Sequence, residues 1–412
     1  MSNSQLSTFN SQLIPPGYKQ TEVGVIPEDW NLRQLGDVVT FLDGRRRPVK
    51  DADRAKMRGP IPYYGASGIV DYVNDYLFDE DLILLGEDGE NILSRNCRLA
   101  FRISGKAWVN NHAHVLKPNP DISIGFLTDY LESLNYERFN SGTAQPKLNK
   151  QTCFGIPIAL PPTKAEQEAI AEALSDADTL IESLEQLLTK KHQLKQGAMQ
   201  ELLTGKKRLP GFSGKWEMRR LGECLISPPD YGINAPAVSY SDRLPTYIRI
   251  TDISEDGRFA PDVLVSVAHP DAERYYLSAG DLVFARTGAS VGKSYLCNPC
   301  DGPLVFAGFL IRVRPDSSRL IPAFLSNFVQ TRSYWNWVKQ MSMRSGQPGI
   351  NGSEFARLLL PCPSVAEQAA ITAILSDMDA EIAALEAKLA KARPLKQGMM
   401  QELLTGRVRL IN

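Results

Sequence analysis

Two stretches of the chain carry apolar residues that are spaced alternately by four and three positions. The two series are Ile170, Leu174, Ala177, Ile181, Leu184 and Leu188, and Ile371, Leu375, Met378, Ile382, Leu385 and Leu389. This spacing places the side chains along one seam of a helix, as in helices that pair in a coiled coil. We therefore predict two long helices with matching apolar seams.

The two helical stretches are copies of one sequence. Residues 165–205 align without a gap with residues 366–406, a shift of 201 positions, and 25 of the 41 aligned pairs are identical. A duplication of this length indicates a repeated architecture. Identical seams in one chain are natural partners, so we predict antiparallel pairing; packing of each helix on a globular core is the alternative. Gly205 is expected to cap the first helix, and Pro394, where the first copy has Gln193, to bend or interrupt the second.

A shorter repeat marks the beginning of two larger blocks. The segment from Trp30 to Asp37 resembles the segment from Trp216 to Glu223, at a shift of 186 positions. The order along the chain is therefore block, helix, block, helix. The predicted parts are an N-terminal extension at 1–26, domain 1 at 27–162, a central helix at 163–208, domain 2 at 209–363 and a C-terminal helix at 364–412.

Both domains mix short strands, helices and turns. The runs at residues 82–85 and 282–285 are wholly apolar, which is typical of strands buried on both faces. Both domains close with Ser-Gly, Gln-Pro and Asn in the same order, but they have diverged almost everywhere else. We predict an α+β chain in which two mixed α/β domains are separated by an antiparallel coiled coil, in a pseudo-two-fold arrangement. Two unlike domains on copies of one helix would present two different binding surfaces, so a DNA site read by them would be bipartite and asymmetric.

Composition limits where such a chain works and how it could bind DNA. The 412 residues are 43% hydrophobic and 23% charged, as in ordinary soluble proteins, and no apolar run approaches the length of a membrane span. The first 13 residues do not resemble an export signal, and six scattered cysteines suit reduced thiols. We therefore expect a cytoplasmic protein. The net charge of −1 argues weakly against nucleic-acid binding, so any DNA affinity must come from local patches.

Three segments are candidates for contact with DNA. A basic loop early in domain 1 could lie on phosphates, polar residues after the buried strand of domain 2 could read base edges, and the shared Gln and Asn could pair with adenine. The alternatives are a solvated loop, a polar turn and turn chemistry that closes a sheet, and all stay open. The candidate residues are Arg45, Arg46, Arg47, Lys50, Gln145, Lys147, Asn149, Arg286, Thr287, Lys293, Ser294, Arg344, Gln347 and Asn351.

Motifs for catalysis are incomplete. The run from Gly288 to Ser294 is one residue shorter than a phosphate-binding loop requires. The run from Ser227 to Tyr231 resembles an amino-methyltransferase motif, but an aspartate stands where an aromatic ring must stack on the flipped base, so we interpret it as a turn. Cys297 with Cys300, and His112 with His114, have no further ligands at metal-binding spacing and are interpreted as structural. We therefore predict no catalytic residues, no bound metal and no cofactor in this chain.

Three sequence motifs of the chain resemble those of a known family. The opening Thr21 to Trp30, the Leu-Pro-Pro followed by Ala-Glu-Gln at the first helix, and the twin Gln-Glu-Leu-Leu-Thr-Gly ends are similar to the specificity subunit of type I restriction-modification systems. The resemblance implies that each domain is a target-recognition domain for double-stranded DNA. It also implies two methyltransferase subunits docked on the helices, restriction subunits in the full complex, and S-adenosylmethionine, ATP and magnesium on those partners.

The function predicted is therefore sequence-specific DNA recognition without catalysis, with the helices setting the spacing between two half-sites. One alternative is an enzyme, either a DNA adenine methyltransferase or an NTPase with degenerate motifs. Another is a coiled-coil scaffold with no role on DNA. Cofactor binding by the isolated chain would favour the enzyme, whereas salt-dependent binding to duplex DNA would exclude the scaffold.

Overall fold

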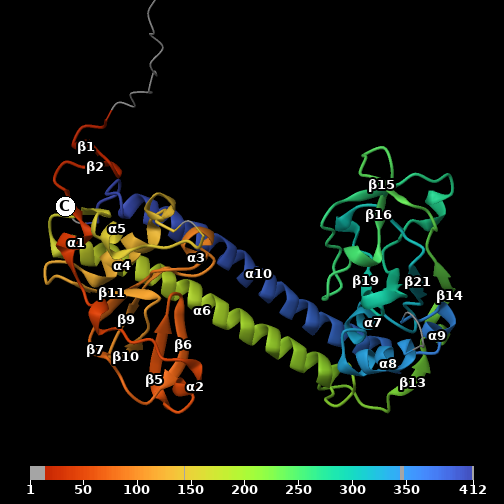
Figure 1. The fold of residues 1–412 in the computed structure, drawn as a ribbon. Helices are drawn as coiled ribbons and strands as arrows, with labels where there is room; N and C mark the ends of the chain where they lie inside the picture. Colours follow the sequence, from red (N-terminus) through yellow and green to blue (C-terminus); the bar gives the residue numbers. More distant parts are fainter. Residues whose placement is uncertain (1–13, 143, 344–347, 411–412) are drawn as a thin grey trace, which may run out of the picture. The chain divides into compact units, whose positions relative to one another are not determined.

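The structure is a computed structural model that describes residues 14–142, 144–343 and 348–410. The chain divides into two compact units. Unit 1 comprises Met1–Glu185 and Ala387–Asn412, and unit 2 comprises Gln186–Glu386. Each unit thus holds one domain, the first half of the helix that follows it and the last half of the other helix. Figure 1 shows this for unit 1, where the blue C-terminal end of the chain lies with the red and yellow domain.

Domain 1 is built on two four-stranded sheets. One has the order β4-β11-β8-β9 and is antiparallel, and the other has the order β6-β5-β10-β7 with β5 and β10 parallel. All five residues of β8 are buried, as its apolar run predicts. The strands β1 Tyr18–Thr21 and β2 Gly24–Pro27 pair with each other and belong to the predicted N-terminal extension, up to the first residue of domain 1. The elements of domain 1 are β3 Asn31–Gln34, α1 Leu35–Val38, β4 Val39–Phe41, η1 Asp43–Arg45, α2 Asp51–Arg54, β5 Arg58–Gly65, β6 Gly68–Val73, β7 Phe78–Asp79, β8 Leu82–Gly86, α3 Asn91–Ser94, β9 Ala100–Ile103, β10 Lys106–Val109, β11 Ala113–Pro118, α4 Ile124–Ser133, η2 Glu137–Phe139, α5 Lys150–Phe154 and β12 Pro157–Leu160.

Domain 2 repeats this plan. Its sheets have the orders β14-β21-β18-β19, which is antiparallel, and β15-β17-β16-β20, in which β16 and β20 are parallel. Strand β18 is buried throughout, like β8. The elements are β13 Glu217–Arg220, η3 Leu221–Cys224, β14 Leu225–Tyr231, β15 Ala237–Ser239, β16 Thr246–Ile248, η4 Ile250–Asp252, β17 Val265–Val267, η5 Ala272–Tyr275, β18 Leu282–Ala285, η6 Gly288–Ser290, β19 Ser294–Leu296, η7 Pro299–Asp301, β20 Leu304–Phe306, β21 Leu310–Pro315, α7 Pro322–Phe328, α8 Arg332–Ser342, α9 Gly352–Ala356 and β22 Leu359–Cys362.

Two helices of 39 residues each carry the repeated sequence, α6 (Lys164–Leu202) and α10 (Val365–Leu403). Their burial follows the predicted seam, with covered positions every four and three residues. The first seam residues pack into the neighbouring domain: Ile170 lies in the core of domain 1 and Ile371 in the core of domain 2. Further along α10, Ile382 and Leu389 stay buried, and ion pairs join the two helices beside them. Both interpretations of the seam therefore hold, each for a different part of the helix.

Ion pairs across the two helices define their direction. Within each unit, higher residue numbers on one helix pair with lower numbers on the other. The pairs are Asp178–Lys396 and Glu185–Arg393 in unit 1, and Lys191–Glu381 and Lys195–Asp379 in unit 2. The predicted antiparallel pairing is therefore confirmed in both units.

Equivalent contacts join the end of one helix to the start of the other in each unit. In unit 1, Arg409 beyond the end of α10 binds Glu166 at the start of α6, with 2.8 Å between Nη2 and Oε2. In unit 2, Arg208 beyond the end of α6 binds Glu367 at the start of α10, with 2.6 Å between Nε and Oε1. The duplicated sequence thus forms the same joint twice, once in each unit.

A glycine after each helix completes this joint. Gly205 adopts a positive φ angle of 73°, as the predicted cap requires, and the equivalent Gly406 does the same at 70°. A Cβ atom on Gly205 would lie 3.1 Å from the Trp216 ring, and one on Gly406 would lie 3.0 Å from the Trp30 ring. The tryptophans of the shorter repeat therefore pack on the glycines of the longer one, which explains why both repeats are present.

Two sequence interpretations need correction. Helix α10 runs without a break through Pro394, so the helix is not interrupted there, and the expected bend stays a prediction. Proline has no N–H group, so the carbonyl of Ala390, four residues earlier, loses its helical hydrogen bond. Residues 390 and 394 are both exposed, and this carbonyl can bind water instead. The run from Ser227 to Tyr231 is not a turn but lies in strand β14, whose pairing with β21 has two register shifts. Irregularities of this kind allow a strand to contain prolines.

Among the described helices, none combines the length and apolar character needed to cross a bilayer.

Candidate nucleic-acid interface

The loop with the shared Gln-Pro pattern covers the turn after β8 in domain 1. Leu148 N donates to Glu87 O at 2.7 Å, and Gly89 N donates to Pro146 O at 3.0 Å. The loop that was predicted from the repeat therefore pairs with the turn after the buried strand.

Domain 2 forms the same pair of segments after β18. Ile350 N donates to Arg286 O at 2.9 Å, and Gly288 N donates to Pro348 O at 3.1 Å. These bonds make Arg286 the structural equivalent of Glu87. The backbone is kept at this position, but the side chain has opposite charge.

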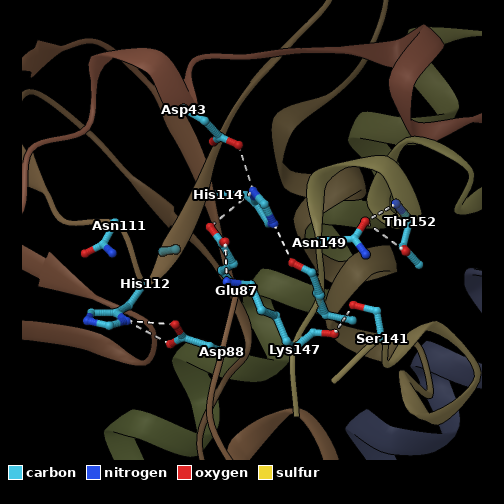
Figure 2. Close-up of polar contacts among 12 residues, drawn as sticks. Asp43, Glu87, Asp88, Asn111, His112, His114, Ser141, Lys147, Asn149 and Thr152 are labelled. Carbon is cyan, nitrogen blue, oxygen red and sulfur yellow. Dashed lines mark hydrogen bonds and ion pairs between the residues drawn. The ribbon is translucent and has the colours of Figure 1, made fainter. Parts of the chain in front are cut away.

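The two asparagines of the shared pattern cap short helices. Asn149 Oδ1 accepts from Thr152 N at 2.8 Å at the start of α5 (Figure 2). Asn351 Oδ1 accepts from Glu354 N at 2.9 Å at the start of α9. For these two side-chain oxygens the structure favours turn chemistry.

A buried ionic network lies beneath the loop in domain 1. His114, only 1% exposed, is 2.8 Å from Asp43 through Nδ1 and 2.8 Å from the Leu148 carbonyl through Nε2 (Figure 2). Both partners can only accept, so both ring nitrogens carry protons. Burial opposes this charge, but the hydrogen bonds to Asp43 and Cys153 outweigh it and raise the pKa of His114 to about 10. The histidine therefore has a structural role, as the sequence interpretation expects, and the folded domain keeps it charged.

Glu87 is the second carboxylate of this network. Arg46 Nη1 binds Glu87 Oε2 at 2.6 Å, and Lys147 Nζ lies 3.3 Å from Glu87 Oε1. Burial would raise the pKa of Asp43, but the hydrogen bond from His114 more than offsets this effect and the pKa is lowered. The network joins the basic loop, β11 and the Gln-Pro loop into one rigid edge.

The basic loop of domain 1 divides into two kinds of residue. Arg45 lies over the Phe78 ring at 4.4 Å and pairs with Glu80, and Arg46 belongs to the buried network, so both stabilise the domain. Arg47 and Lys50 are exposed, and their side chains have no ion pair among the described residues. The second pair is therefore better placed for phosphate contact.

The remaining candidates are distributed over both domains. Gln145 and Lys147 are exposed beside the turn after β8, and Arg286 and Thr287 form the equivalent turn after β18. Lys293 pairs with Glu255 at 2.6 Å. Ser294 is only 2% exposed and cannot reach a ligand without rearrangement. Arg344 and Gln347 lie outside the described residues.

Several residues at these turns were not among the sequence candidates. Asp88 and His112 form an exposed pair in domain 1, with 2.9 Å between Oδ1 and Nδ1 (Figure 2). Phe309 and Tyr231 are exposed in domain 2. No local motif marks them, because they come from separate strands that only the folded sheets bring together. Within the described ranges there is no cluster of three or more residues suited to a metal ion.

These features define a protein with two modules of the same plan and different surface chemistry, joined to a duplicated helix. A family model described as "Type I restriction modification DNA specificity domain" matches residues 27–195 and 238–392. The chain therefore belongs to the type I restriction-modification DNA specificity family. It is a DNA-recognition subunit and not a catalytic one, and the resemblance seen in the sequence is confirmed.

Individual relatives agree with this assignment. The MjaVIII specificity subunit of Methanocaldococcus jannaschii is 24% identical over 94% of this chain and 95% of its own length. A Haemophilus influenzae protein named as a type I restriction enzyme specificity subunit is 36% identical, but the match spans only 34% of this chain and 35% of that one. The crystal structure of the S subunit from M. genitalium has a TM-score of 0.60 at 14% identity, and the match covers 91% of this chain and 96% of that one. The predicted fold class, two sheet-rich α/β domains with two long antiparallel helices, is thereby confirmed.

Proposed function

We propose that each domain binds one half of a bipartite, asymmetric site in double-stranded DNA. The observation that supports this most is that the two domains keep one backbone around the loop and turn, with Glu87 in one and Arg286 in the other. Unlike side chains on a common scaffold bind unlike base sequences, because each base pair presents its own pattern of donors and acceptors in the major groove. The two half-sites must then differ.

The proposed phosphate contacts are exposed cations that the fold leaves without a carboxylate. Arg47 and Lys50 of domain 1 meet this condition among the described residues. Lys147 forms an ion pair with Glu87, but its side chain remains half-exposed, and the exposed Gln145 lies two positions before it. Arg344 and Gln347, which lie outside the described residues, are also part of the proposal. A few local contacts of this kind can anchor DNA although the whole chain is nearly neutral.

The two helices are proposed to set the distance between half-sites and to carry the catalytic partners. A helix of 39 residues is about 58 Å long at 1.5 Å per residue, more than the roughly 34–36 Å of one duplex turn. Two methyltransferase subunits would dock on faces outside the seam, and restriction subunits would join for cleavage. S-adenosylmethionine, ATP and magnesium would be bound by those subunits, in the cytoplasm. The domain limits 27–162 and 209–363 are part of this proposal.

Methylome sequencing of a host that expresses this chain with its methyltransferase tests the proposal. The expected motif is split and asymmetric, with a fixed gap. Exchange of residues 27–162 for the matching domain of another specificity subunit should change one half of the motif only. A continuous or palindromic motif, or a change of both halves after the exchange, would contradict it. A gel shift on random duplex at low and high salt excludes a scaffold role if affinity falls steeply with salt.

A further inference from the structure

Each domain has a second turn that meets the turn after the buried strand. In domain 1, Glu87 N donates to His112 O at 2.8 Å, and Asn110 N donates to Tyr64 O at 3.1 Å. In domain 2, Arg286 N donates to Phe309 O at 3.0 Å, and Ala307 N donates to Ile248 O at 3.0 Å. The residues Glu87, Asp88, Asn110, Asn111 and His112 are here called corner 1, and Arg286, Thr287, Ala307, Gly308 and Phe309 are called corner 2.

The hydrogen bonds align the two corners residue by residue. Glu87 corresponds to Arg286, and His112 corresponds to Phe309. Asn110 corresponds to Ala307, because each donates to the strand that runs parallel to its own, β5 or β16. The backbone is therefore conserved, while every one of these side chains has changed its chemistry.

Corner 2 combines a free cation with an exposed aromatic ring. The Arg286 guanidinium lies 5.0 Å from the centroid of the Tyr231 ring and has no carboxylate partner among the described residues. The Tyr231 hydroxyl accepts from Gly352 N at 3.0 Å, which holds the ring in place. Phe309 is 59% exposed beside this pair. The fixed Arg286 guanidinium forms no ion pair with the described residues, and the exposed Phe309 ring is not part of a core, so neither side chain stabilises the domain in an evident way.

Corner 1 is polar and contains a buried amide. Asn110 is only 7% exposed, and its Oδ1 accepts from His112 N at 2.8 Å. Its Nδ2 has no partner among the described residues, and Asn110 lines a pocket of about 500 Å³ together with Tyr63 and His112. Asn111 next to it is exposed and has no side-chain hydrogen bond within the described part of the chain. Unused amide groups here are available to an external ligand.

We propose that these two corners are the base-reading elements, which deepens and rests on the proposed DNA-recognition function. Arg286 reads a guanine through its O6 and N7 atoms, and Phe309 makes an apolar contact with a thymine methyl group in the same half-site. Asn111 reads an adenine in the other half-site through N6 and N7. The side-chain geometry of arginine permits a bidentate pairing with guanine, and that of asparagine permits one with adenine. The Tyr231 ring under the Arg286 guanidinium holds this group in place before DNA binds.

The test compares methylomes of hosts that express single variants together with the methyltransferase partner. With Arg286→Gln, discrimination at one guanine of the second half-site should fall by about tenfold to a hundredfold, which is the value of one bidentate contact. With Asn111→Ala, an adenine of the first half-site should relax by a similar factor. Each variant is the control for the other, because only one half of the motif should change in each. Arg274→Gln, an exposed arginine of domain 2 outside the corner, should leave the motif unchanged.

The outcomes separate this inference from the proposed function. If the wild-type motif is split but neither half changes in Arg286→Gln, Phe309→Ala and Asn111→Ala, the corners do not read bases and only the present inference fails. If the wild-type motif is not split, the proposed function fails as well. Where Arg286→Gln does not fold, Arg286→Lys keeps the charge but loses the bidentate geometry, and an unchanged guanine preference in that variant overturns the assignment.

Discussion

The two domains hold the same antiparallel sheet together with different buried cations. In domain 1 the cation is His114 on β11, which binds Asp43 at 2.8 Å. In domain 2 it is Arg312 on β21, only 3% exposed, which binds Asp230 through Nη2 at 2.6 Å and the Tyr276 carbonyl at 2.9 Å. Both cations tie the central strand to a carboxylate on or beside its neighbouring strand. The histidine can lose its charge within a usable pH range, whereas the arginine cannot.

The comparison teaches that both domains have kept a buried positive charge in this sheet, although the residue that carries it has changed. Each domain needs a buried positive charge to neutralise an acidic group near the edge that we propose to face DNA. Removal of either cation would leave a carboxylate in a poorly hydrated place, which costs several kcal/mol. The domains should therefore respond alike to loss of the cation and differently to pH.

The largest effect is expected for Arg312→Met. The buried Asp281 keeps only Arg314 and Asp230, which is 42% exposed, loses its partner, so domain 2 should lose about 3 kcal/mol of unfolding free energy, the lower end for a broken buried pair. Hydrogen exchange of the β18 and β21 amides measures this loss. Arg314→Met is the matched control on the same strand; its side chain is about a third exposed, and a change below about 1 kcal/mol is expected. Equal effects of the two substitutions would show that burial of the ion pair is not what matters.

The next effect is a loss of stability in domain 1 at alkaline pH. The pKa of His114 is about 10 in the folded chain and 6.5 for an ordinary histidine, so the native state holds the extra proton between these values. The stabilisation is complete below pH 6.5 and is lost as the pH rises through 10, with a slope of at most about 1.4 kcal/mol per pH unit. Hydrogen exchange of β8 and β11 at pH 7 and pH 9 should show this slope in the wild type and not in His114→Gln. The same substitution should leave β18 and β21 unchanged, and an identical slope in both proteins would contradict the assignment.

The smallest effect concerns a contact that the two units share. Gln167 Oε1 accepts from Ser123 N at 2.8 Å in unit 1, and Gln368 Oε1 accepts from Ile321 N at 2.8 Å in unit 2. Replacement of either glutamine by alanine leaves a covered backbone N–H unpaired and should cost about 1–3 kcal/mol. The two losses, measured by urea unfolding, should be equal within error. Glu168→Ala, an exposed neighbour on α6, should change stability by less than about 0.5 kcal/mol; a loss at only one glutamine would break the equivalence of the joints.

The repeated parts were predictable because their signal is local and periodic. The seam of α6 and α10, the wholly buried strands β8 and β18, and the glycine caps each follow from neighbouring residues. Pro394 shows the limit of local rules, since an exposed proline is tolerated inside a helix that packing holds on its other side. Two of the predicted site residues show the same limit: Arg46 is polar in sequence, yet the fold pairs it with the half-buried Glu87, and Ser294 is only 2% exposed.

The sequence by itself determined that this chain has two unlike domains on two copies of one helix, because duplication and heptad spacing are properties of residue order. Only the tertiary structure decided that the end of each helix joins the domain next to the start of the other, as Gly406 meets Trp30 and Gly205 meets Trp216. Tertiary structure also decided that Arg286 and Phe309 share a corner although 23 positions separate them. Contacts between distant segments depend on how whole sheets and helices bury their apolar faces together, and no local pattern encodes that choice.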